Sequence, residues 1–258
     1  MENIVKKYSE YTENVAETWK KRLTWQGLNG REPKHTTSII KFNEETNAFA
    51  SLAGINTANK FFEAVEKLAG DYTQWVSTKE HPYSEKEYND MRNFFVGALG
   101  EMFFYHVFMD VKNLLVQTDN TNTHDIVYFS HVSPTLAKDK DYGVDFTAVA
   151  NGVGCVMQVK FWNPFDTKTK MDAVTVAQKA FAEGVAHDLI EPKQNNTVVL
   201  CCLFDETTVY GKFASDSEWK RRVVVVGKDC LEKNINGETK KVFWDNFVGY
   251  LANLKTSC

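Results

Sequence analysis

The sequence predicts an α/β fold with a mixed central sheet flanked by helices and preceded by a helical segment. Residues 1–90 are amphipathic with helix-like spacing, and six short runs rich in β-branched and aromatic residues follow them. One long helical pattern separates the fourth run from the fifth. We therefore expect two parts, a helical extension over residues 1–85 and an α/β core over residues 86–258.

Helices are predicted at residues 2–23, 57–70 and 84–111. GLNGREPKHTT is expected to be a turn-rich connection, and SIIKF a short strand. The pattern at 84–111 is the strongest, because Ser84 and Glu87 form a potential capping box. From Phe94 onward this helix is apolar nearly all round, which is typical of a buried helix.

The expected strands are apolar runs bounded by Asn, Asp, Gly and Pro. They are NLLVQTD, HDIVYFS, VDFTAVA, GCVMQVKFW, NTVVLCCLF and RRVVVVG. A helix at about 171–190 is predicted between the fourth and fifth runs, and VFWDNFVGYLANL is predicted to be the closing helix.

Composition favours a soluble globular protein, since the chain of 258 residues is 43% hydrophobic and 25% charged. No apolar run approaches the roughly 20 residues of a membrane span, and the polar N-terminus does not resemble a signal peptide. The five cysteines lack metal-ligand spacing and predict reduced thiols in the cytoplasm. The net charge of −4 indicates no basic stripe along the chain.

The runs VDFTAVA and GCVMQVKFW, with the turn-like AVANGVG between them, predict a β-hairpin. This hairpin carries polar groups at its open end. Alternation places Gln158 and Lys160 on one face of a strand, and Asp145 can meet them across the hairpin. Glu101 interrupts the apolar surface of the preceding helix and can approach the same place. Burial of an ionised carboxylate costs a free energy on the order of several kcal/mol unless the group pairs, is protonated or binds a cation.

This set of groups suits the hydrolysis of a phosphodiester. Carboxylate oxygens of Asp145 and Glu101, with the amide oxygen of Gln158, can hold one or two Mg²⁺ ions, for which Mn²⁺ is an expected substitute. Such ions polarise a phosphate and lower the pKa of bound water. Lys160 can orient the attacking water and stabilise charge on the phosphate oxygens.

The segment DYGVDFTAVANGVGCVMQVKFW resembles the nuclease core of the PD-(D/E)xK superfamily, and is most similar to the Mrr-like restriction endonucleases with Gln-x-Lys. The resemblance extends over about residues 90–235 and includes GALGEMFF, the helix that donates a glutamate. It implies a restriction-endonuclease-like core, with Asp145 and Glu101 as metal-associated acids, Gln158 as a neutral ligand and Lys160 as the catalytic lysine. It further implies Mg²⁺-dependent cleavage of DNA in restriction or another form of defence, often by a homodimer.

Simpler interpretations remain open beside this one. Lys160 can pair with Asp145 as an ordinary ion pair, and Asp125 is a substitute acid. The chain can also be a non-catalytic nucleic-acid-binding or assembly protein on the same fold, or a nuclease that cuts RNA or processes DNA ends. Neither a membrane partner nor an organic cofactor is expected, because the motifs for phosphate loops and dinucleotides are missing.

Basic residues near the predicted strands are candidate contacts to nucleic-acid phosphates, with solvated loop charges as the alternative. They are Lys138, Lys140, Lys168, Lys170, Lys220, Arg221 and Arg222. The histidines His106, His124 and His187 show no pattern and are interpreted as packing or surface residues.

Overall fold

The protein is described from a computed structural model, which covers residues 34–79, 83–110, 113–117, 124–134, 143–163, 172–190 and 197–234. The described part consists of helices first, then four consecutive strands, and then two further strands with helices before and after them. The helical part comprises α2 (Lys34–Thr46), the 3-10 helix η1 (Ala48–Leu52), α3 (Ala58–Lys79) and α4 (Glu85–Asp110). Helix α4 begins at the predicted capping box, where the Glu87 carboxylate accepts from the backbone N–H of Ser84 at 2.7 Å.

The α/β part follows α4 and contains all six predicted strands. Its elements are β1 (Asn113–Gln117), β2 (His124–Pro134), β3 (Phe146–Ala150), β4 (Val153–Val159), α5 (Ala173–Ala186), β5 (Thr197–Cys201), α6 (Glu206–Gly211), α7 (Ser217–Arg222), β6 (Val223–Val226) and α8 (Lys228–Asn234). The strands lie in the order β1-β2-β3-β4-β5-β6. The pairs β1–β2, β2–β3 and β3–β4 are antiparallel, whereas the pairs β4–β5 and β5–β6 are parallel. The protein is therefore a mixed α/β structure, as predicted.

Strand β2 is shared between two partners, which bends the sheet. Its first half pairs with β1 and its second half with β3, and the register shifts between Ser130 and Ser133. Such irregularities increase the local twist of a strand. The sheet curls as a result, and β1 comes beside β6 and α8.

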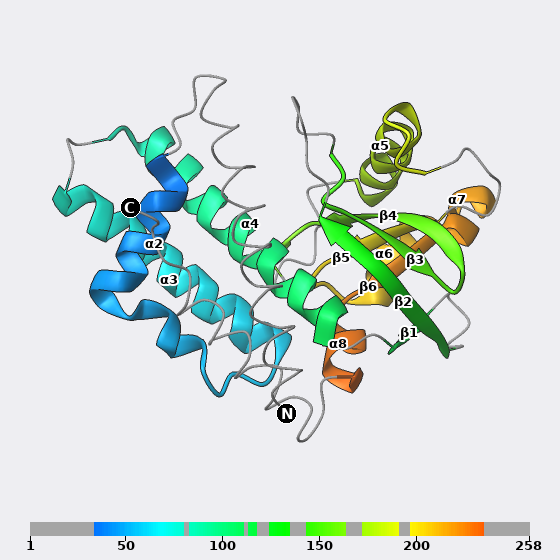
Figure 1. The fold of residues 1–258 in the computed structure, drawn as a ribbon, viewed down its shortest axis with the longest axis horizontal. Coiled ribbons are helices and arrows are strands. Elements are labelled where there is room, and N and C mark those ends of the chain that lie inside the picture. Colours follow the sequence, from blue (N-terminus) through cyan, green and yellow to red (C-terminus); the bar gives the residue numbers. More distant parts are fainter. Residues whose placement is uncertain are drawn as a thin grey trace.

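Helices cover both faces of the sheet. Figure 1 shows α4 between the α2 and α3 helices and the sheet, with α5 beyond the sheet. One apolar cluster joins α2, α3 and α4 to Phe146, Met157 and Cys201 of the sheet. A second cluster lies on the α5 face and includes Val156 and Leu200. The described helices of the N-terminal segment thus share a core with the sheet.

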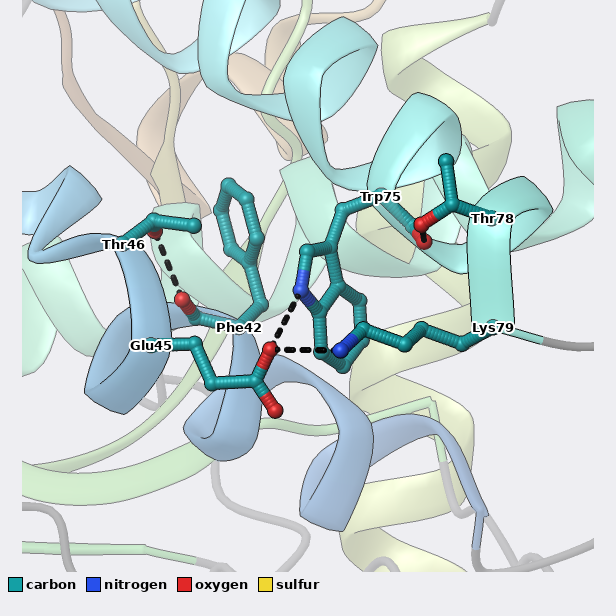
Figure 2. A network of polar contacts seen from close by, with 6 residues as sticks. All are labelled: Phe42, Glu45, Thr46, Trp75, Thr78 and Lys79. Atoms are coloured by element: carbon teal, nitrogen blue, oxygen red, sulfur yellow. Dashed lines mark hydrogen bonds and ion pairs between the residues drawn. The ribbon is translucent and has the colours of Figure 1, made fainter.

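Helix α2 is attached to α3 by an aromatic and polar network, which Figure 2 shows at close range. The Glu45 carboxylate accepts a hydrogen bond from Trp75 Nε1 at 3.0 Å and pairs with Lys79 at 3.0 Å. The Phe42 ring packs edge-on against Trp75, with ring centroids 5.8 Å apart. The interface between α2 and α3 therefore contains both apolar and polar contacts.

The structure corrects several predictions. SIIKF and the last four residues of GLNGREPKHTT lie in α2, so the predicted strand and part of the connection are wrong. Ile39, Phe42 and Asn43 are buried at helical spacing, which five residues alone could not distinguish from a strand. The helix predicted at 57–70 continues to Lys79.

Three short helices, α6, α7 and α8, were not predicted. Two of them separate β5 from β6, where the sequence had suggested consecutive strands. The helices predicted at 2–23 and 242–254 lie outside the described residues. None of the described helices has the length and apolar character that crossing a membrane requires.

Candidate active site at the end of strand β4

The predicted hairpin forms, and its turn sets the register of the site. Asn151 and Gly152 connect the two strands with φ values of 48° and 80°, both in the left-handed region that favours Asn and Gly. Strands β3 and β4 pair Phe146 with Met157, so the next pair outward is Asp145 opposite Gln158. The backbone N–H of Asp145 continues the pairing, because it donates to the Met157 carbonyl at 2.9 Å.

The Asp145 carboxylate is buried and is held by β4. Its Oδ2 accepts a hydrogen bond from the Gln158 side-chain amide and another from the backbone N–H of Val159, the latter at 2.7 Å. Asp145 is 3% exposed and Gln158 is 5% exposed. Hydrogen bonds to a buried carboxylate offset part of the cost of removing it from water. The structure therefore brings together two of the four predicted site residues.

Lys160 continues the line of β4 beyond its last strand residue. Its backbone N–H donates to the Cys201 carbonyl at 2.8 Å, which extends the ladder to β5. Met157 and Val159 face the α4 cluster, so alternation directs Gln158 and Lys160 to the opposite face, the α5 side. Lys160 is half-buried there. Whether Lys160 pairs with Asp145 as an ordinary ion pair stays a prediction.

Glu101 approaches this place from the other side of the sheet. It is half-buried on α4, and its neighbours on that helix contact Phe146 of β3 and Phe161, which follows β4. Gly100 lies against the Phe161 ring, and Tyr105 stacks on Phe146 with ring centroids 5.5 Å apart. Helix α4 thus reaches the tip of β4, one residue beyond Lys160. The metal-binding role of Glu101 stays a prediction.

A second lysine lies close to the site, on a helix that sequence reasoning did not connect with it. A Cβ placed on Gly143 would lie 3.4 Å from Cε of Lys179 and 3.9 Å from its Nζ. Gly143 has φ +66° and precedes Asp145 by two residues. Lys179 belongs to α5, the layer on the Gln158 and Lys160 face. The only sequence signal for this lysine was its exposed position on a helix that connects two strands.

A cluster of three acids, Asp205, Glu206 and Asp229, lies at the carboxyl ends of β5 and β6 and was also missed. Glu206 is 1% exposed. Its Oε1 accepts from the backbone N–H groups of Gly227 and Cys230 at 3.2 and 2.6 Å, and its Oε2 accepts from that of Asp229 at 3.1 Å. Glu206 therefore caps the start of α8, and burial raises the pKa of its carboxyl to about 7.

The basic residues that were candidates for nucleic-acid contacts are divided by the structure. Lys220, Arg221 and Arg222 form the last turn of α7, at the start of β6 and so at the opposite end of the parallel strands from Lys160. Arg222 already pairs with Glu218 at 3.0 Å and lies over the Phe181 ring. The remaining candidates, Lys138, Lys140, Lys168 and Lys170, lie outside the described residues.

Other candidate groups do not join the site. Asp125, the substitute acid, sits in the half of β2 that pairs with β1, away from the hairpin. Burial lowers the pKa of His106 to about 3, so this histidine is neutral near pH 7. Burial also raises the pKa of Cys155 to about 12, which leaves that thiol unreactive. The cysteines Cys155, Cys201, Cys202 and Cys230 are all buried.

The donor set at the open end of the hairpin fits a hard cation. The Asp145 carboxylate accepts hydrogen bonds from the Gln158 amide and the Val159 backbone, and a carboxylate can also bind a cation through its oxygens. Because the Gln158 amide nitrogen donates to Asp145, the amide oxygen is the atom that Gln158 has to offer a metal. Oxygen ligands of this kind suit Mg²⁺, and alternation along β4 places Lys160 on the same face as Gln158.

Comparisons of the chain with protein-family models, with curated proteins and with solved structures find no match.

Proposed function

We propose that the protein is a Mg²⁺-dependent endonuclease that hydrolyses DNA phosphodiester bonds, with a restriction-endonuclease-like core of the PD-(D/E)xK type. One observation carries the proposal. Asp145 at the start of β3 lies opposite Gln158 on β4 and accepts a hydrogen bond from it, and alternation places Lys160 on the same face. The resemblance of the sequence to Mrr-like enzymes depends on these three residues.

The arrangement of the strands supports a substrate site at this edge. Strands β4, β5 and β6 run parallel, and α5 connects β4 to β5. Ligands of open α/β sheets bind outside the carboxyl ends of such strands. Lys160 directly follows the carboxyl end of β4, and Asp145 lies opposite Gln158 beside it.

Each residue then has a role that follows from its position. Asp145 and the Gln158 amide oxygen would hold Mg²⁺, which polarises a phosphate and lowers the pKa of bound water. Glu101 lies on α4, on the other face of the sheet, and would reach the ion only around the end of β4. Hydrogen bonds from Gln158 and Val159 orient the Asp145 carboxylate. The Lys160 ammonium orients the attacking water and stabilises charge that develops on the phosphate oxygens.

Lys179 extends the site on the α5 side. Its ammonium lies over Gly143, near the start of the strand that carries Asp145. A second positive charge at this position suits the phosphate next to the one that is cut, because lysine binds phosphate as a point charge. Lys179 therefore contributes to substrate binding more than to the chemical step.

A second candidate function is a non-catalytic nucleic-acid-binding or assembly protein on the same fold. The Gln158–Asp145 hydrogen bond favours it, because this bond also fastens the open end of the hairpin without any metal. The presence of Lys160 beside a buried acid favours the enzyme, since a purely structural hairpin has no use for this ammonium.

The test is a cleavage assay with circular and linear DNA and with RNA, each with Mg²⁺, with Mn²⁺ and with EDTA. We expect metal-dependent nicking of circular DNA, and loss of at least about 100-fold in rate for Lys160→Ala. Lys86→Ala is the matched control, because Lys86 is exposed near the start of α4, about 22 Å along that helix from Glu101. Cleavage of linear ends alone would make the protein an exonuclease, and cleavage of RNA alone a ribonuclease. No metal-dependent cleavage of any substrate would refute the enzyme.

A further inference from the structure

Phe161, the residue after Lys160, leaves the sheet and inserts between helices of the N-terminal part. Its ring stacks on Phe62 with centroids 5.6 Å apart and meets Phe61 edge-on at 5.8 Å. Both partners belong to α3, and both are buried. The chain end of β4 is therefore anchored to a helix that precedes it by about 100 residues of sequence.

On another side, the Phe161 side chain lies against a glycine of helix α4. A Cβ on Gly100 would lie 2.5 Å from Cδ2 of Phe161 and 2.9 Å from its Cβ. Gly100 is inside a helix, where glycine costs about 1 kcal/mol relative to alanine. Its φ is not positive, so backbone conformation does not require glycine here. The close approach of Phe161 is the physical reason for a glycine at this position.

The anchor fixes the direction of the neighbouring lysine. Val159 and the Phe161 ring both pack in the cluster on the α3 and α4 face, so Lys160, which lies between them, is directed to the other face, with Gln158 and Asp145. Two backbone hydrogen bonds complete the restraint. Lys160 donates to Cys201 at 2.8 Å, and Trp162 donates to the Lys160 carbonyl at 2.8 Å.

The geometry points to Phe161 as a positioning residue of the proposed active site, through which α3 and α4 set the place of the Lys160 ammonium. The inference rests on the proposed function, because it assigns to the helical segment a part in the same reaction. Phe161 acts through Lys160 and touches no substrate. A displacement of about 1 Å at a catalytic group can lower a rate by about 100-fold, so a tight anchor has a direct consequence for turnover.

The variant that tests the anchor is Gly100→Ala, whose methyl group displaces the Phe161 ring. We expect kcat for DNA cleavage to fall at least about 10-fold, with DNA affinity and Mg²⁺ requirement within about 3-fold of wild type. In the double variant Gly100→Ala with Phe161→Leu the smaller side chain makes room for the methyl group. We expect it to recover most of the lost rate, a non-additivity that only residues in contact show.

Gly97→Ala is the matched control, because a Cβ on Gly97, one turn earlier in α4, meets nothing within 4 Å. This variant should retain wild-type kcat. Wild-type kcat in Gly100→Ala would overturn the inference, as would equal losses in Gly97→Ala and Gly100→Ala. If Gly100→Ala does not fold, the single variant Phe161→Leu tests the inference. Its kcat should fall while its affinity for DNA is retained, and an unchanged kcat would overturn the inference.

Hydrogen exchange of the Lys160 amide provides a readout that does not depend on cleavage. This amide bonds to Cys201, so we expect exchange at least about 10-fold faster in Gly100→Ala, and near wild type in the double variant and in Gly97→Ala. If the wild-type protein cleaves no nucleic acid, the proposed function fails. Unchanged exchange in Gly100→Ala would then show separately that Phe161 does not hold Lys160.

Discussion

Glu206→Gln should change how the stability of the protein depends on pH. In the folded protein, burial raises the pKa of Glu206 from 4.5 to about 7, while three backbone N–H groups at the start of α8 favour its ionised form. The carboxylates of Asp205 and Asp229 lie in the same cluster, and the charge of Asp229 raises the pKa of Glu206 further. The folded state therefore binds the Glu206 proton more tightly than the unfolded state does.

The sign and size of the effect follow from linkage. The stability contributed by the Glu206 proton is fully present below about pH 4.5 and is lost as pH rises through about 7. A shift from 4.5 to about 7 corresponds to about 3 kcal/mol, of which 2 to 3 kcal/mol, roughly, is lost between about pH 5 and pH 8. The amide of the Gln variant does not titrate, so this part of the pH dependence should disappear.

The assay is urea unfolding followed by tryptophan fluorescence at several pH values from about 5 to 8, in EDTA. The free energy of unfolding of wild type should fall relative to that of Glu206→Gln by about 2 to 3 kcal/mol across this range. Asp172→Asn is the control. The pKa of Asp172 is lowered by its hydrogen bond with Thr175, so its contribution is lost only as pH falls, and its curve should parallel wild type here.

Parallel curves for wild type and Glu206→Gln would refute the reasoning. Repeating the series with Mg²⁺ tests the other use of an acidic cluster. If Mg²⁺ stabilises wild type but not the Gln variant, the three acids bind a cation, and the capping interpretation is wrong.

Four further outcomes are expected. In a metal titration of cleavage, Gln158→Glu should still cut and need less Mg²⁺, whereas Gln158→Ala should need more or lose activity; if both match wild type, Gln158 is not a ligand. Lys179→Ala should weaken DNA binding in Ca²⁺ and lower the slope of log K against log salt by about one, while an unchanged slope would remove Lys179 from the substrate path. Gly227→Ala should lower the free energy of unfolding by more than about 2 kcal/mol in urea titrations, because its Cβ would lie 2.5 Å from the Phe204 carbonyl oxygen, and a stable variant would contradict the packing. The protein should be a homodimer with DNA, and light scattering that shows only monomer with and without DNA would refute this.

Local rules predicted those elements whose signals lie within the elements themselves. The hairpin turn carries Asn151 and Gly152, and the start of α4 carries Ser84 and Glu87, so short-range chemistry fixed both. The pairing of Asp145 with Gln158 followed from the same turn, since its length sets the register. SIIKF failed because its burial depends on α3 and α4, which a window of five residues does not contain.

The missed features depend on contacts between distant segments. Helices α6 and α7 are six residues long, too short for a periodic pattern, although Asp205 and Asp216 cap them with side-chain bonds to Thr208 and Trp219. Because the donors are backbone N–H groups, the available signal was an aspartate at a potential N-cap position. Nothing in the sequence near Lys179 indicated Gly143, because a crossover helix brings them together.

The contact between α3 and the end of β4 has a consequence for the order of folding. During synthesis the Phe61 and Phe62 side chains leave the ribosome about 100 residues before Phe161, and the place of the Phe161 ring beside α3 and α4 stays unfilled in the meantime. Contacts this far apart in sequence close late, because the loop entropy must be lost first. A chain truncated after α4 would lack the ring that fills the space between the two helices. The core of the helical segment is therefore complete only after strand β4 has been synthesised.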